Sequence, residues 1–288
     1  MKAERLRRRR AVNRLMELMA WLAAASAVAV LGVVVWSIGS RAYKAIDLAF
    51  FTKVPQPFSF VPVETGIANA FIGSLILVGL ATLMALPLGV LVAIYLNEFA
   101  RPRLAVAVST TLDILAGIPA IVIGIFVFAL FVAGRGHSGF AGSFALSIIM
   151  LPLIARSTQE ILRLVPESTR EASLALGVSR WRTTLSVVLP QTIGGILTGG
   201  VLAVARVAGE TAPLLFTSSI AGTAVNADPH QALASIPVTI LEYSESPLPE
   251  DHEQAWAAAF VLIVFILVVS LAARAVAAWH RRRMGLAR

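Results

Sequence analysis

Six long apolar runs limit this chain to one class of fold. Each run reaches the roughly 18 to 20 residues that a helix needs to cross about 30 Å of hydrocarbon, and they lie near residues 15–38, 67–96, 104–133, 138–155, 187–220 and 255–279. The runs lack the alternation of a lipid-facing barrel, whereas a helix satisfies its own backbone donors. Only 14% of the 288 residues are charged, too few for the surface of a soluble protein. The sequence therefore predicts an all-α polytopic membrane protein with six transmembrane helices.

The basic residues are divided unequally between the two sides of the membrane. With a cytoplasmic N-terminus, 19 of the 24 Lys and Arg residues fall in cytoplasmic segments, and the outer segments hold only Arg41, Lys44, Lys53 and Arg135. The positive-inside rule therefore places both termini in the cytoplasm. The net charge of +8 reflects this topology, and we expect no nucleic-acid partner. The first run is longer than the about 7 to 15 apolar residues of a signal peptide, so we expect a retained anchor.

These boundaries divide the chain into four parts. Residues 1–14 form a basic cytoplasmic N-terminus, residues 15–66 the first transmembrane helix and an outer loop, residues 67–280 a core of five helices, and residues 281–288 a cytoplasmic tail. The outer segment at about 214–253 has six acidic residues and no Lys or Arg, and both a solvated loop and a gate or docking surface fit it. The chain has no cysteine, and its four histidines lack metal-ligand spacing, so we expect no metal site.

A polar, arginine-bearing loop at about residues 156–190 interrupts the apolar pattern between the fourth and fifth runs. Pro166 and Glu167 suit the first turn of a helix, and Gly177 suits its C-terminal end. Ser179 can cap a second helix that leads through Trp181 directly into the fifth run. An interfacial helix pair anchored at the lipid headgroups is the simpler interpretation of this pattern.

The spacing inside this loop favours a more specific interpretation. It is similar to the EAA loop of ATP-binding-cassette (ABC) importer permeases, which reads Glu-Ala-Ala, three residues, Gly, nine residues and Ile-x-Leu-Pro. The matching residues here are Glu171, Ala172, Ser173 in place of the second Ala, Gly177, Val187 in place of Ile, Leu189 and Pro190. The resemblance implies a type I importer permease fold in which residues 156–190 form a coupling loop. Its first helix would dock in a groove of an ATPase subunit.

The fifth run holds two charged residues, Arg206 and Glu210. Four residues apart, they would share one helix face and can form an ion pair. Arg206 would lie about 24 Å along the helix from Pro190, in the outer half of the bilayer. A structural ion pair and a place on an anion's route both fit these residues. Asp113, in the third run, either caps the N-terminus of its helix or belongs to the same path.

Three further segments resemble permeases of the phosphate-specific ABC importer. They are YLNEFA at 95–100, TLDILAGIPAIVIGIF at 111–126 and AVARVAGETAPLLF at 203–216. Chain length and the compact N-terminus resemble the PstA-type subunit more than its paralogous PstC-type partner. The resemblance implies a phosphate path that includes Arg206, Glu210 and Thr211, in the inner membrane of a bacterium.

The same resemblance implies the partners. They are a PstC-type permease, two PstB-type ATPase subunits and a PstS-type phosphate-binding protein on the outer face. This chain has no glycine-rich motif that would cradle a nucleotide, so we expect no catalytic residue and no cofactor here, with ATP and Mg bound by the ATPase subunits. A permease for another oxyanion, such as molybdate or phosphonate, remains an alternative. A secondary transporter or channel is a further alternative, although such proteins usually show internal repeats and we find none.

Overall fold

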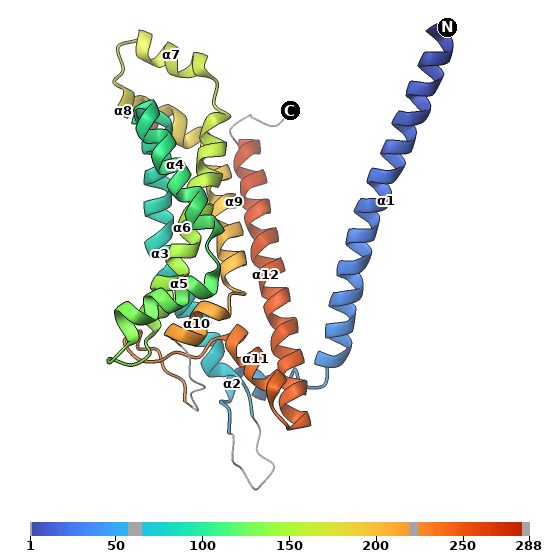
Figure 1. The fold of residues 1–288 in the computed structure, drawn as a ribbon, viewed down its shortest axis with the longest axis vertical. Helices are drawn as coiled ribbons and strands as arrows, with labels where there is room; N and C mark the ends of the chain where they lie inside the picture. The colour runs from blue at the N-terminus through green and yellow to red at the C-terminus, as the bar shows by residue number, and fades with distance from the viewer. Residues whose placement is uncertain (1, 57–64, 219–223, 284–288) are drawn as a thin grey trace.

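The described part of the computed structural model comprises residues 2–56, 65–218 and 224–283, and it is helical with no strand. Five helices are long and apolar enough to cross a membrane. They are α1 (Lys2–Ala42), α3 (Ala68–Ile94, extended by the π-helical turn η1, Tyr95–Phe99), α6 (Gly139–Arg163), α9 (Leu189–Val207) and α12 (Pro249–Arg283). A bent pair of helices supplies a sixth span if the pair is counted as one. Figure 1 shows these helices running roughly parallel, as expected of a polytopic membrane protein.

The third span is broken rather than merely kinked. Helix α4 (Pro102–Gly117) ends before Pro119, and α5 (Ala120–Val127) with its π-helical continuation η2 (Phe128–Val132) leaves at 96°. Proline lacks a backbone donor and clashes with the preceding turn, so it ends a helix whose neighbours do not restrain it. Pro87, by contrast, lies inside α3, which continues through it.

The fifth span is shorter than its apolar run. The prediction of one continuous span over 187–220 is wrong, because α9 ends at Val207 and a separate helix, α10 (Ala212–Thr217), follows. Pro213 lies in the first turn of α10, where its missing donor costs nothing. At its other end α9 is joined without a gap to α8 (Arg180–Thr183) and the π-helical turn η3 (Thr184–Val188).

Helices α3, α6 and α9 form the centre of the bundle. Fully buried side chains there are Leu77, Leu146, Met150 and Ile154. Close approach of these helices depends on glycine, because a residue without a side chain lets two backbones come together. A Cβ on Gly89 would lie 2.8 Å from the Ile154 side chain, and one on Gly195 would lie 2.7 Å from Ile161.

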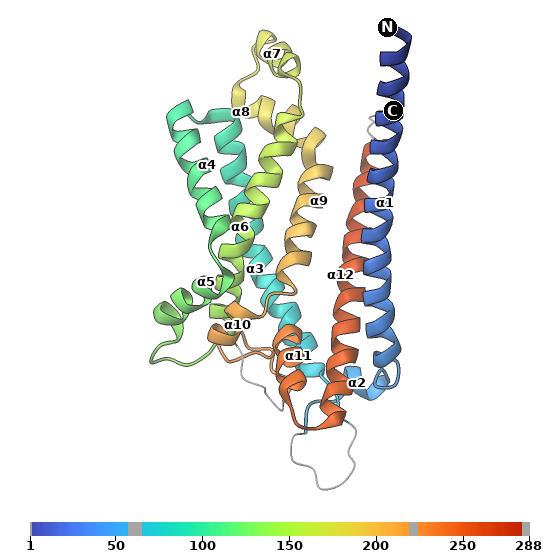
Figure 2. The ribbon, with the colours of Figure 1, turned by 45° about the vertical axis from the view of Figure 1, so that its right-hand side comes forward.

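The acidic outer segment is not simply a solvated loop. Its described part includes α11 (Ile236–Glu245), and Leu233, Ile236 and Val238 are buried against the bundle. The hydroxyl of Ser74 on α3 accepts a hydrogen bond of 2.8 Å from the Ile236 backbone N–H. This segment therefore closes the end of the bundle at which α3 begins, beside α2 (Leu48–Thr52), as Figure 2 shows.

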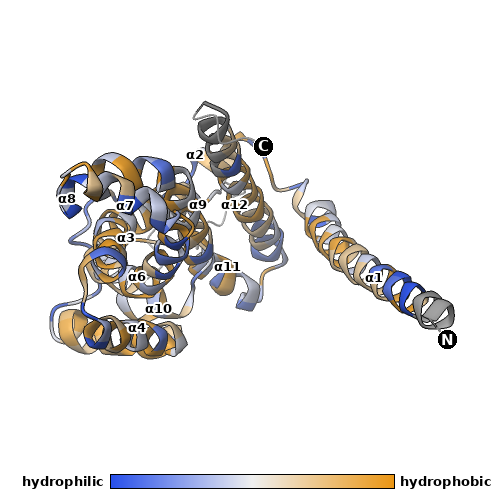
Figure 3. Ribbon diagram, turned by 90° about the horizontal axis from the view of Figure 1, so that it is seen from above, coloured by the Kyte–Doolittle hydropathy of each residue, from blue (hydrophilic) through white to orange (hydrophobic). Residues whose placement is uncertain are grey.

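Helix α1 leans away from the rest of the molecule. Figures 1 and 2 show it approaching α12 at its own C-terminal end, where the Arg41 guanidinium lies 4.6 Å from the centre of the Trp256 ring. Its apolar side chains are exposed, including Trp21 at 75% and Trp36 at 78%. Figure 3 shows apolar residues along the outward surfaces of α1, α4 and α12 and polar residues near the end of α1 that bears the N-terminus. Such a surface is the one that lipid or another membrane subunit covers.

Candidate coupling loop and substrate path

The first short helix of the candidate coupling loop, residues 156–190, is α7 (Glu167–Ala175), which follows Pro166. Gly177 has a φ of +79°, a left-handed conformation that favours glycine. The Gly177 N–H donates to the Leu174 carbonyl at 2.9 Å, and the Val178 N–H donates to the Ser173 carbonyl at 3.2 Å. This pair of bonds is the Schellman motif, which satisfies carbonyls at a helix end. The expected helix stop at Gly177 is therefore present.

The second helix of the coupling loop leads directly into the membrane. Ser179 occupies the N-cap position of α8, but its side chain makes no capping hydrogen bond, so that detail of the expectation is wrong. The Ser173 and Thr183 hydroxyls lie 2.9 Å apart and join α7 to α8. Pro190 lies in the first turn of α9, and Leu189 packs beside the buried Val188. Helix α7 is thus one tight turn away from the fifth span.

Most of the surface of α7 is exposed and is not covered by other parts of this chain. None of its residues is buried, and both Glu171 and Ala172 are exposed. Leu174 is 39% exposed and Leu176, just past the helix, is 84% exposed. These exposed polar and apolar side chains leave α7 accessible to a partner protein.

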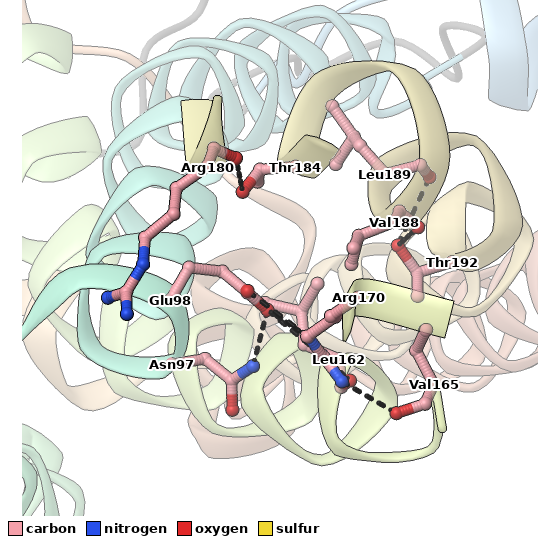
Figure 4. A network of polar contacts seen from close by, with 10 residues as sticks. All are labelled: Asn97, Glu98, Leu162, Val165, Arg170, Arg180, Thr184, Val188, Leu189 and Thr192. Carbon is pink, nitrogen blue, oxygen red and sulfur yellow. Dashed lines mark hydrogen bonds and ion pairs between the residues drawn. The ribbon is translucent and has the colours of Figure 1, made fainter. Parts of the chain in front are cut away.

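An ion pair beneath α7 links the coupling loop to the second span. Arg170 on α7 contacts Glu98 in η1 with an N–O distance of 2.9 Å, and the Asn97 amide donates to the same carboxylate at 2.7 Å (Figure 4). The Arg170 guanidinium also donates to the Leu162 and Val165 carbonyls, at 2.9 and 2.7 Å. Sequence reasoning missed this pair because its members are 72 residues apart and no local spacing connects them.

Beside this ion pair, the loop encloses a polar groove of about 500 Å³. Its lining includes acidic and basic side chains from both the loop and the end of the second span, among them Glu98, Arg163, Glu167, Glu171 and Arg180. The mixed charge suits a protein surface that carries both signs better than it suits a free anion.

Arg206 and Glu210 do not form an ion pair, which was one of the two interpretations that fit these residues. Because α9 ends at Val207, Glu210 lies in the break before α10 rather than one turn further along the same helix. Arg206 is exposed in the last turn of α9, and Thr211 takes the N-cap position of α10 without a side-chain capping bond. The prediction of a shared helix face is wrong for this physical reason.

The structure instead places both charged residues at the break in the third span. Arg206 and Glu210 line a cavity of about 60 Å³ whose other walls include Ala116, Ile118 and Ala120, from the α4–α5 break. Helix α5 also packs closely on α10, since a Cβ on Gly124 would lie 2.7 Å from the Pro213 Cα. Two interrupted spans therefore meet at the one place where the fifth run is charged.

Asp113 does not cap a helix N-terminus. Helix α4 begins at Pro102, so Asp113 lies near its C-terminal end, and it forms an ion pair with Arg156 of α6. Arg156 also donates to the Ser109 carbonyl at 2.6 Å and to the Gln159 amide oxygen at 3.2 Å. Arg156, expected in a cytoplasmic loop, belongs to a helix that continues to Arg163. Within the described residues no group of three or more acidic or histidine side chains is placed to hold a metal ion.

Comparison with known proteins identifies the family. The family described as "Binding-protein-dependent transport system inner membrane component" matches residues 85–285, which is most of the chain. The chain belongs to this family. It is therefore a multi-pass transport component of the inner membrane rather than an enzyme.

Relatives within the family point to one branch of it. The chain is 40% identical over 247 residues to the phosphate transport system permease protein PstA of Yersinia pestis, covering 84% of this chain and 83% of the relative. It is 36% identical over 269 residues to the protein of the same description from Pasteurella multocida, covering 92% and 94%. A chain of a solved bacterial alginate ABC transporter, in complex with an alginate pentasaccharide-bound periplasmic protein, is 17% identical with a TM-score of 0.59, covering 92% of this chain and 95% of that chain. That last similarity supports the type I permease-like fold alone.

Proposed function

We propose that this chain is the membrane permease subunit of an ATP-driven importer of inorganic phosphate. The observation that carries the proposal is the 36–40% identity, over most of both chains, to phosphate transport permeases of the PstA type. In this role the chain pairs with a paralogous PstC-type permease to form the path. Two PstB-type ATPase subunits bind ATP and Mg, and a PstS-type protein delivers phosphate at the outer face.

We further propose that the coupling loop receives the ATPase. Exposed Glu171 and Ala172 on α7 form the docking face, with Ser173 holding α7 to α8, and Gly177 sets the turn that aims this face away from the bundle. Leu189 and Pro190 connect the turn to α9. Movement of α7 can then pass along the chain to Arg206, which lies at the far end of α9. This arrangement requires the loop and both termini to be cytoplasmic, in agreement with the charge distribution.

The proposed phosphate path runs past the two broken spans. Arg206 offers a forked guanidinium suited to an oxyanion, and Glu210 and Thr211 lie in the adjacent break. A lone arginine in hydrocarbon costs at least about 3 kcal/mol, so an exposed Arg206 favours a watery route or a subunit boundary over a lipid-facing position. Asp113 and Arg156 do not line this cavity, but they lie near its lining residues Leu115 and Leu153 along α4 and α6, on the side toward the coupling loop.

Reconstitution tests the proposal. The complex purified through a tag on this chain is placed in proteoliposomes with ATP on the loop side and the binding protein on the other side. We expect labelled phosphate to accumulate only with ATP and the ATPase subunits present, and excess unlabelled phosphate to compete far better than molybdate or phosphonate. Accumulation without ATPase subunits, or better competition by another oxyanion, would refute the assignment.

A further inference from the structure

Arg170 is the main polar attachment of α7 to the transmembrane bundle. Helix α7 buries none of its residues, so packing holds it weakly. The side chain of Arg170 points inward and is only 15% exposed, and that of its partner Glu98 is 9% exposed. Figure 4 shows the guanidinium between the end of the second span and the segment that leaves α6.

The contacts of this one side chain reach three separate elements. The Arg170 Nε donates to Glu98 Oε2 at 3.2 Å and the Arg170 Nη2 donates to Glu98 Oε1 at 2.9 Å, so two guanidinium nitrogens bind the two carboxylate oxygens in a bidentate contact. The remaining donors satisfy the Leu162 and Val165 carbonyls at and beyond the end of α6, where carbonyls lack partners within the helix. Arg170 therefore joins α7 simultaneously to η1 and to the end of α6.

Neither covalent connection of α7 leads to η1. One runs through residues 164–166 to the end of α6, and the other passes through the turn at Gly177 to α8 and then to α9. Helix α3, which η1 extends, packs along α6 at the centre of the bundle rather than following from the loop in sequence. A displacement of α7 would move α9 through the chain, but it would move α3 only through a non-covalent contact such as Glu98–Arg170.

We propose that the Glu98–Arg170 ion pair is a mechanical link that transmits movement of the coupling loop to α3, while the chain itself transmits that movement to α6 on one side of α7 and to α9 on the other. This inference rests on the proposed docking of α7 on an ATPase. Glu98 and Arg170 are positioning residues, since they touch neither phosphate nor nucleotide. Loss of the link leaves the exposed docking face of α7 in place but separates ATP hydrolysis from transport.

The test measures phosphate transported per ATP hydrolysed by the purified complex in proteoliposomes. The variants are Glu98→Gln, Arg170→Gln and the double variant, and the matched control is Arg103→Gln. Arg103 is an exposed cytoplasmic arginine near the start of α4 and has no ion pair in the described structure. Arg103→Gln therefore removes one positive charge, as Arg170→Gln does, but leaves the Glu98–Arg170 ion pair intact. Complex yield, co-purified ATPase and thermal melting are recorded for each variant.

We expect each single variant to retain the ATPase and to lower transport per ATP about fivefold or more, the lower end of typical coupling between two sites. The double variant should lose no more than the worse single variant, because both changes remove one contact. Arg103→Gln should transport as the wild type does. Unchanged transport per ATP in Glu98→Gln and Arg170→Gln would overturn the link, as would a loss of yield with normal transport by the surviving complexes. If the wild-type chain retains no ATPase, the docking proposal and the link both fall.

Discussion

Gly177 provides the sharpest test of the coupling loop. Its φ of +79° lies in the left-handed region, and the Schellman bonds that end α7 depend on it. Nothing lies within 4 Å of the place where a Cβ would stand, so a Cβ here meets no other atom of this chain. The whole effect of substitution therefore comes from the backbone conformation.

The magnitude follows from that conformation. An L-residue in the left-handed region costs about 1–2 kcal/mol relative to glycine, which corresponds to about a 5- to 30-fold loss of the native turn. Asparagine tolerates this region best among the other residues and β-branched valine worst. We expect ATPase affinity to fall in the order Gly177, Gly177→Asn, Gly177→Ala, Gly177→Val, with the valine variant at least about tenfold weaker.

The assay titrates the ATPase subunit onto the permease complex in lipid nanodiscs and follows both binding and hydrolysis. Gly134→Val is a matched control, because Gly134 has a φ of +76° and an equally open surrounding but lies in the turn between η2 and α6, at the opposite end of the molecule from α7. That variant should bind the ATPase normally. Equal ATPase affinity in wild type and Gly177→Val would refute the reasoning.

Three other predictions concern the membrane-embedded part. Arg206→Gln should reduce phosphate uptake at least about tenfold while the subunit stays in the membrane. Arg206→Lys should be intermediate, because lysine keeps the charge but cannot bind an oxyanion through two parallel N–H donors. Uptake equal to wild type in Arg206→Gln would mean that Arg206 has a structural role only. Gly124→Ala should lower the melting temperature of the complex, since its Cβ would meet the Pro213 backbone at 2.7 Å and overpacking costs about 1–3 kcal/mol; an unchanged melting curve would contradict the close approach. Arg156→Gln should destabilise the complex more than Asp113→Asn. The Arg156 side chain is 29% exposed and makes two further hydrogen bonds, whereas the Asp113 side chain is 66% exposed, and an exposed ion pair contributes less than about 1 kcal/mol. A larger loss of stability in Asp113→Asn would contradict this.

The sequence predicts the spans and the loop because both depend on local signals. Apolar length specifies a membrane helix, and Pro166 and Gly177 mark the two ends of α7 through backbone preferences that act within a few residues. The helix stop at Gly177 is present for that reason, and the continuous chain from α8 through η3 to α9 gives the expected entry into the fifth span.

The site residues were harder to place because hydropathy does not reveal breaks in a span. The run at 187–220 is apolar throughout, yet Gly209 and Pro213 permit a new helix to start, which moves Glu210 off the face of Arg206. Glu98 and Arg170 carry no local signal of their pairing, since it depends on how α3 and the coupling loop pack in three dimensions. Long-range polar contacts of this kind follow from tertiary structure alone.

A crosslink from α7 tests most directly whether this loop couples an ATPase to transport. The sequence has no cysteine, so Ala172→Cys introduces a single thiol on the exposed face of α7. With a thiol- and amine-reactive crosslinker, we expect a covalent adduct with the ATPase subunit and a loss of ATP-driven phosphate uptake in proportion to its yield, whereas Gly134→Cys should give neither. Absence of an ATPase adduct at Ala172→Cys, or full uptake after complete crosslinking there, would contradict the account.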